Sequence, residues 1–116
     1  MMDLDYIESE LELEIPTVYR MFLQQADENG IDLNALDFFD AEERFVEFNE
    51  SMADDWPQWD SNLLAFGPDD GCGNWFVIDA TSVDADNVLL VAHDPVGIEP
   101  VGTATDFFAN YLKHAP

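Results

Sequence analysis

Cysteine and histidine, two residue types that often carry catalysis or metal binding, are scarce in this sequence. There is one cysteine, and there are two histidines, among 116 residues. The single cysteine, Cys72, excludes an intramolecular disulfide, so nothing indicates an oxidising compartment. His93 and His114 are too few, and their spacing is wrong, for a zinc site. We therefore expect a protein that needs no metal and no cofactor.

Basic residues are almost as rare. Arg20, Arg44 and Lys113 stand against 26 acidic residues, which gives a formal net charge of −23. Such a field repels nucleic acids and anionic membranes, and it attracts cationic partners. The excess is greatest in residues 1–60, where 18 acidic residues face two basic ones. We expect a basic protein partner. Solubility and a high-salt cytoplasm are the alternatives, and an aromatic content of 13% fits the high-salt alternative poorly.

Long hydrophobic runs are also missing. No stretch approaches the roughly 18 apolar residues that a membrane span needs. The first residues, MMDLD, lack the basic start and apolar run of a secretory signal, so we expect a cytoplasmic protein. The length suits a single domain over residues 1–116, and a hydrophobic content of 47% is enough for a core. We expect a monomer or a weak dimer.

Apolar residues recur at helical spacing in the first half of the sequence and at its end. The expected helices cover residues 3–14, the segment from Pro16 to Asn29, the segment after Asp40, and the segment from Thr105 onward. The clearest apolar stripe belongs to the second helix and consists of Tyr19, Phe22, Leu23 and Ala26. Gly30 follows, and it suits the left-handed position that ends many helices.

Two details of this half are less regular. Asp40 and Glu43 make a capping-box-like pair, so we expect Asp40 to cap the third helix. Residues 31–39 fit no single pattern, and their last apolar residues, Phe38 and Phe39 with Leu36, could begin a short strand.

After residue 60 the hydrophobic pattern changes from helical to extended spacing. We expect strands at residues 63–66, 74–78, 87–92 and 98–101. Three glycines in residues 67–73 suit a hairpin turn between the first two strands. The third run is mostly apolar and should lie in the interior of the sheet. This order predicts an α+β fold: an antiparallel sheet of about four or more strands, packed with N-terminal helices and a C-terminal helix.

Several short motifs follow one another along nearly the whole chain. Residues 15–23 read IPTVYRMFL, Gly30 follows the second helix, and Asn49 lies late in the third. The other motifs are LAFG at 64–67, DDGCGN at 69–74, FVID at 76–79, His93-Asp94, and the closing helix at 105–112. In this order they resemble the SUKH superfamily, whose second helix opens with LP-x-x-Y-x-x-F-L. Cys72 and Asp70 depart from the glycines that are usual in the family's turn.

The resemblance implies a binding protein rather than an enzyme. The superfamily includes bacterial immunity proteins, many of which are thought to block a toxin encoded beside them, often a nuclease. It also includes fungal regulators of cell-wall synthesis, which act as scaffolds. We therefore expect an immunity protein that neutralises a basic toxin domain, with a nuclease as one candidate. A regulatory scaffold that binds a cellular protein is the alternative.

The sequence supports a catalytic or metal-binding role less well than a binding role. Cys72, His93 and Asp94 could be combined into a nucleophilic triad. A catalytic thiol, however, needs a nearby cation or helix N-terminus, and its neighbours Asp69 and Asp70 are anionic. The same turn could offer oxygen ligands to calcium, but it lacks the ligand spacing of an EF-hand loop. We expect no catalytic residue and no metal ligand.

The most distinctive candidate surface is the segment DDWPQWD at residues 54–60. It combines two tryptophans with three acidic residues, and aromatic anchors within a polar rim are typical of interface hot spots. The residues expected to contact a partner are Asp54, Asp55, Trp56, Trp59, Asp60, Asp69 and Asp70. The alternative for Trp56 and Trp59 is a purely structural role, in which they cover an edge of the sheet or join the core.

Overall fold

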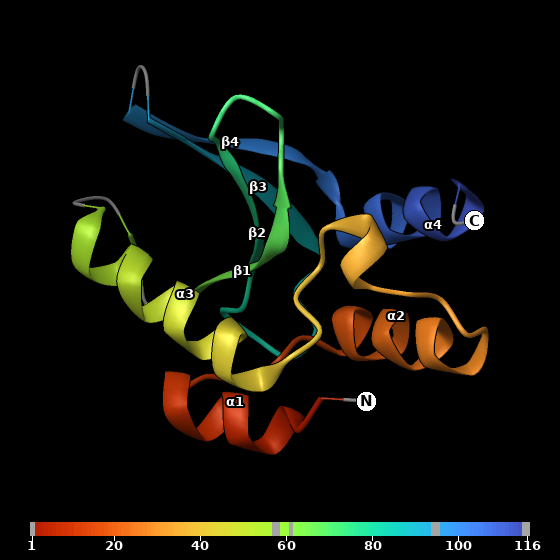
Figure 1. Ribbon diagram of the computed structural model, residues 1–116. Helices are drawn as coiled ribbons and strands as arrows, with labels where there is room; N and C mark the ends of the chain where they lie inside the picture. Colours follow the sequence, from red (N-terminus) through yellow and green to blue (C-terminus); the bar gives the residue numbers. More distant parts are fainter. Residues whose placement is uncertain (1, 57–58, 61, 94–95, 115–116) are drawn as a thin grey trace.

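The computed structural model describes residues 2–56, 59–60, 62–93 and 96–114, and Figure 1 shows how its elements are arranged. The elements in chain order are α1 (Leu4–Leu11), α2 (Thr17–Glu28), the 3-10 helix η1 (Asn34–Leu36), α3 (Glu42–Asp55), β1 (Leu63–Asp69), β2 (Trp75–Asp79), β3 (Asn87–His93), β4 (Val96–Thr103) and α4 (Ala104–His114). The expected succession of helices, strands and a last helix is confirmed. None of the described helices is long and apolar enough to cross a membrane.

The strands form one antiparallel sheet in the order β1-β2-β3-β4. Each strand pairs with the next one along the chain, so the sheet is a meander. β3 pairs on both of its sides, which confirms the interior position expected for this apolar run. Because helices precede and follow the sheet, the architecture is the α+β fold that the sequence predicts. In Figure 1 the β3–β4 hairpin projects away from the helices.

Alternation of side chains along the strands gives the sheet two different faces. The inner face, on the side of the helices, carries Leu64, Phe66, Ile78 and Val88. The outer face, on the opposite side, carries Leu63, Ala65, Val77 and Val91.

The inner face supports a core rich in aromatic rings. Tyr19 of α2 lies edge-on to Phe45 of α3 and to Phe108 of α4, with ring centroids 6.1 and 5.4 Å apart. Phe66 of β1 lies 5.6 Å from the same ring. Four elements thus meet around one buried tyrosine, which explains why the apolar stripe of α2 is strict. Within the described residues the Tyr19 hydroxyl has no hydrogen-bond partner, and burial raises the pKa of Tyr19 far above its ordinary value.

Asn49 of α3 satisfies the free edge of β1. Its amide nitrogen donates to the carbonyl oxygens of Phe45 and Ala65, both at 2.9 Å. Its amide oxygen accepts from the Ala65 N–H at 2.8 Å. The backbone groups of Ala65 would otherwise be open to pairing with another strand. Because Asn49 is buried, these bonds fix the position of α3 along β1.

Residues 31–39 and the start of α3 differ from the sequence expectations. No strand forms within residues 31–39. Instead, the Phe39 N–H donates to the Phe66 carbonyl at 3.1 Å, and Phe38 and Phe39 are buried. These residues are apolar because they cover the end of β1. The expectation that Asp40 caps α3 is also wrong, because the helix begins at Glu42 with Ala41 at its N-cap and has no side-chain cap.

Gly67 permits this close approach between the segment 37–39 and β1. It has a φ of +129°, and a Cβ added there would lie 2.3 Å from the Asp37 carbonyl oxygen and 2.8 Å from the Phe39 nitrogen. No side chain larger than hydrogen fits between these backbones. The glycine expected in a turn therefore lies inside β1, and the turn itself starts after Asp69.

Candidate functional site

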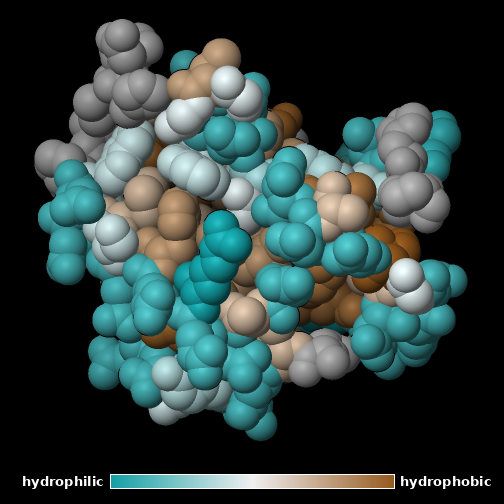
Figure 2. All heavy atoms as spheres, viewed as in Figure 1, coloured by the Kyte–Doolittle hydropathy of each residue, from teal (hydrophilic) through white to brown (hydrophobic). Residues whose placement is uncertain are grey.

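Basic side chains do little to neutralise the acidic surface. Arg20 forms an ion pair with Glu8, and the Arg44 guanidinium lies 5.7 Å from the centre of the Phe39 ring. Lys113, on α4, is exposed. Figure 2 shows a largely hydrophilic face with hydrophobic side chains visible between the helices. Most of the 26 carboxylates therefore have no basic side chain to pair with, since the chain has three.

Some of these carboxylates lie where a helix least favours them. The C-terminal end of a helix carries partial negative charge. α2 ends with Asp27 and Glu28, α3 ends with Asp54 and Asp55, and neither helix has a basic residue in its last turn. A charge of the wrong sign at such an end costs typically about 0.3–1 kcal/mol. A cation bound at either end would offset that cost.

Trp56 and Trp59, expected as partner contacts, lie just beyond α3. Both are half-buried, and both pack against the cluster of apolar residues on the outer face. Trp59 also lines a small hollow of about 170 Å³ between α1, α3 and Leu63. The structural alternative considered for the two tryptophans therefore accounts for their buried parts. Their exposed parts remain candidates for contact with a partner.

The three acidic residues of the same segment have different surroundings. Asp54 and Asp55 are exposed in the last turn of α3. Asp60 is exposed as well, but its carboxylate accepts from the Asn62 N–H at 2.8 Å, and its carbonyl accepts from the Leu63 N–H at 2.9 Å. Asp60 thus shapes the turn that leads into β1. Asp55 accepts a longer bond, from the Ser51 hydroxyl at 3.4 Å, which leaves Asp54 and Asp55 as the carboxylates best placed for contact.

Asp69 and Asp70 lie at the β1–β2 turn. The Asp70 carboxylate accepts from the Asn74 side chain at 2.9 Å and from the Cys72 N–H at 2.8 Å. These bonds lower the pKa of Asp70, the largest effect coming from the Asn74 side chain and the next from the Cys72 N–H. Asp70 is therefore first of all a turn residue. Among the described residues, no cluster of three or more acidic, cysteine or histidine side chains could hold a metal ion.

The seven expected contact residues fall into two groups. Asp60 lies just before β1, whereas Asp69 is the last residue of that strand. The ends of β1 pair with Asp79 and Trp75 of β2, and because a strand rises about 3.3 Å per residue, these ends are roughly 13 Å apart along the sheet. Asp69 lines a hollow of about 260 Å³ together with Asp37, Arg44 and Trp75, and its charge adds to the burial that raises the pKa of Tyr111 on α4. The structure does not bring the two groups together into one patch.

Cys72 lies exposed in the same turn as a free thiol. His93, a member of the triad that the sequence disfavours, ends β3. Asp94, the third member of that arrangement, lies outside the described residues.

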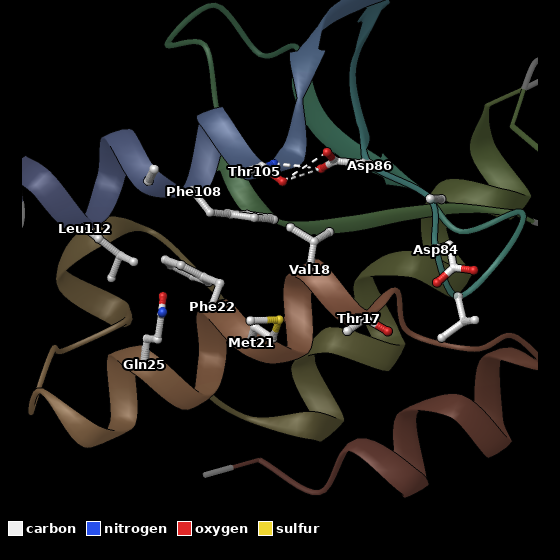
Figure 3. Close-up of a pocket in the computed structure, with 13 residues that line it drawn as sticks. Thr17, Val18, Met21, Phe22, Gln25, Asp84, Asp86, Thr105, Phe108 and Leu112 are labelled. Carbon is white, nitrogen blue, oxygen red and sulfur yellow. Dashed lines mark hydrogen bonds between the residues drawn. The ribbon is translucent and has the colours of Figure 1, made fainter.

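Sequence reasoning missed a groove between α2 and α4. It has a volume of about 480 Å³, and its lining comes from both helices and from the loop at residues 83–86 (Figure 3). Met21 and Val83 both line it and are among the most exposed large hydrophobic residues of the described chain. The only sequence signal for the groove was Met21, an apolar residue outside the apolar stripe of α2. A single apolar residue of this kind does not indicate a groove.

Comparison with known proteins identifies one family. A protein-family model described as SMI1 / KNR4 family (SUKH-1) matches residues 2–110. No curated protein and no solved structure matches the chain.

Proposed function

The chain belongs to the SMI1/KNR4 (SUKH-1) family. We propose that it is a non-catalytic immunity protein that neutralises a basic protein toxin by binding it. The toxin's active site, or its nucleic-acid surface, would be covered by the bound protein. The acidic surface would act partly as a substitute for phosphate charge. The site of action would be the cytoplasm.

The uncompensated acidic surface is the observation that carries this proposal. At a net charge of −23 the acidic residues repel one another, and this repulsion destabilises the compact state. Binding a basic protein would reduce the repulsion and stabilise the folded protein. The carboxylates at the ends of α2 and α3 add to it, because they oppose the helix dipole in the free protein. A basic partner would relieve both effects at once.

We expect the partner to contact the acidic surface at the end of α3. Asp54 and Asp55 are exposed there, and the half-buried Trp56 and Trp59 follow immediately. Carboxylates would speed association, while the exposed parts of the tryptophans would slow dissociation. Asp69 and Asp70 would form a second, separate contact.

The first test uses the product of the neighbouring gene. Co-expression of this chain should restore growth to cells that produce that protein, and the two purified proteins should form a complex. If the neighbouring product is harmless to cells and does not bind, the immunity role is wrong, and a scaffold for a cellular protein becomes the better hypothesis.

Association kinetics then test the role of charge. Long-range attraction fades as the Debye length falls from about 30 Å at 0.01 M salt to about 8 Å at 0.15 M. The association rate of the complex should therefore fall steeply with salt, while the dissociation rate changes little. The double change Asp54→Asn with Asp55→Asn should slow association more than the matched control Glu43→Gln with Glu47→Gln, two exposed residues nearer the start of α3. Equal rates in both variants would place the contact elsewhere.

A further inference from the structure

The groove between α2 and α4 has a floor of buried aromatic rings. Phe22 of α2 and Phe108 of α4 stack with ring centroids 4.7 Å apart and planes within 20°. Both rings are buried, and Figure 3 shows them lying side by side between the two helices. The floor is therefore part of the inner core.

The walls of the groove are apolar but open to solvent. Met21 is 54% exposed and Val83 is 41% exposed, although both are large hydrophobic residues. Val18 and Leu112, each half-buried, lie beside them and line the same groove. Apolar side chains that gather in a hollow and stay exposed are typical of a surface that another molecule covers.

The charge at the rim favours a cationic occupant. Asp84 and Asp86 both line the groove, and no basic side chain is among the described residues that line it. Asp86 is held in place because its carboxylate accepts from the Thr105 N–H at 2.7 Å and from the Thr105 hydroxyl at 3.0 Å. Asp84 is exposed on the same loop. The whole chain adds its net charge of −23 to this local field.

The backbone around the groove favours a helix over an extended segment. An extended peptide needs a strand edge for its own N–H and carbonyl groups. Here the walls are helices, whose backbone groups are bonded internally, and a loop whose Val83 carbonyl already accepts from the Thr17 N–H at 2.9 Å. A helix satisfies its own backbone and needs only a groove for its side chains.

We propose that this groove binds the apolar face of a basic amphipathic helix of the partner. The partner's basic character rests on the proposed function, whereas the place and the helical form rest on the groove itself. Large apolar side chains of the helix would cover Met21 and Val83, and lysines or arginines on its flanks would lie near Asp84 and Asp86.

A synthetic peptide tests the proposal without the natural partner. The probe is a peptide of about five helical turns, built from leucine and lysine with the leucines on one face. The control peptide has the same composition, with the leucines spread around the helix. Calorimetry should give a dissociation constant about tenfold lower for the amphipathic peptide. Its amide NMR shift changes should cluster at Met21, Val83 and Leu112. Equal affinity for the two peptides would overturn the proposal, because simple charge attraction would then explain binding.

Matched variants of the protein locate the contact. The double change Met21→Gln with Val83→Ser should weaken binding of the amphipathic peptide about tenfold. The control double change Ile98→Gln with Val101→Ser alters two similarly exposed apolar residues on β4, at 37% and 46% exposure, and should leave affinity within about twofold. Circular dichroism checks that all variants fold. Unchanged binding in the groove variant would overturn the proposal.

Three further outcomes separate this inference from its competitors. If the free protein forms a dimer that the groove variant abolishes, the occupant is a second copy and the proposal is wrong. If a neutralised toxin binds the groove variant as tightly as the wild type, the groove fails while the immunity function stands. If the peptide binds in the groove but no toxin partner exists, the groove stands while the immunity function fails.

Discussion

The two faces of the sheet are buried in different ways. The inner face lies under helices, and its aromatic rings contact one another across four elements. The outer face has a small cluster. Trp56 and Trp59 pack against it from beyond the end of α3, and Phe48 in the middle of α3 packs against both this cluster and the inner one. The inner cover is built from secondary structure. The outer cover is built from a few side chains that remain half-exposed.

This difference separates residues that make the fold from residues that could serve recognition. When a side chain under packed helices is truncated, the cavity can close only if the helix backbones move. When a side chain under a surface tryptophan is truncated, the indole ring can shift into the cavity. The outer cover can therefore change at a lower cost in free energy of unfolding. A binding surface must tolerate such changes of side chain, and Trp56 and Trp59 lie on the outer face.

Adjacent leucines of β1 give the sharpest test of the comparison. Leu64 is buried on the inner face and Leu63 on the outer face. Truncation to alanine leaves a cavity whose cost depends on how far the surroundings collapse. We expect Leu64→Ala to lower the free energy of unfolding by about 4 kcal/mol and Leu63→Ala by about 2 kcal/mol. Urea denaturation measures both, and equal losses would contradict the difference between the faces.

The β1 edge of the sheet, where Asn49 binds the backbone of Ala65, should show the next largest change in the free energy of unfolding. Asn49→Ala leaves the backbone groups of Ala65 buried without their partner, so we expect a loss of about 2–3 kcal/mol in the free energy of unfolding. Asn29 provides the matched control. Its exposed amide also donates to a backbone carbonyl, that of Gln25 at 2.7 Å. Asn29→Ala should cost well under about 1 kcal/mol, because water replaces the lost bond. Similar losses in both variants would show that burial at Asn49 is not what matters.

Local patterns in the sequence predicted the inner face well. The α2 stripe around Tyr19 is a strict period of apolar residues, and it is buried as that period predicts. The apolar run of β3 predicted a strand in the interior of the sheet, with Val88 on the inner face and Val91 on the outer face. The sequence left Phe38 and Phe39 ambiguous because their burial comes from β1, where the Phe39 N–H bonds to the carbonyl of Phe66, 27 residues further along the chain. Backbone contacts of that kind leave no periodic trace.

The candidate sites were harder to predict for the same reason. The segment 54–60 stands out because its tryptophans and acids are neighbours in the sequence. The groove joins Met21 to Val83 through folding alone, so no local pattern marks it. Asn49 was noticed only through the family resemblance. Its pairing with Ala65 depends on how α3 lies along β1.

The tryptophans of the outer cover should contribute less than a core aromatic. A buried Phe or Trp typically costs about 3–5 kcal/mol on truncation to alanine. Because Trp56 and Trp59 are half-exposed, we expect Trp56→Ala and Trp59→Ala each to lower the free energy of unfolding by about 1–2 kcal/mol. Phe66→Ala, on the inner face, is the reference at about 4 kcal/mol. A loss as large as that of Phe66→Ala in either tryptophan variant would make the outer cover part of the core and weaken its candidacy for recognition.

The smallest effect should come from the ion pair that ties α1 to α2 in the inner cover. One Glu8 carboxylate oxygen accepts from the Ile15 N–H at 2.8 Å, and the other pairs with Arg20. Partial burial alone would raise the pKa of Glu8, but the hydrogen bonds from Arg20 and Ile15 and the charge of Arg20 outweigh it, so the pKa is lowered. A carboxylate with a lowered pKa in the folded state stabilises above its unfolded pKa. That stability is lost as the pH falls through the folded value.

Glu8→Gln should therefore lower the free energy of unfolding near neutral pH by about 0.5–1 kcal/mol, since a partly exposed ion pair is screened by solvent. Below pH 4.5, the ordinary value for this carboxyl, the difference from wild type should shrink towards zero. Removing one negative charge also reduces repulsion in a chain of net charge −23. This gain in the free energy of unfolding partly cancels the loss of the ion pair. Glu47→Gln, at an exposed position on α3, removes the same charge and corrects for that relief. If the two glutamine variants follow the same pH profile, the Glu8–Arg20 pair contributes nothing beyond its charge.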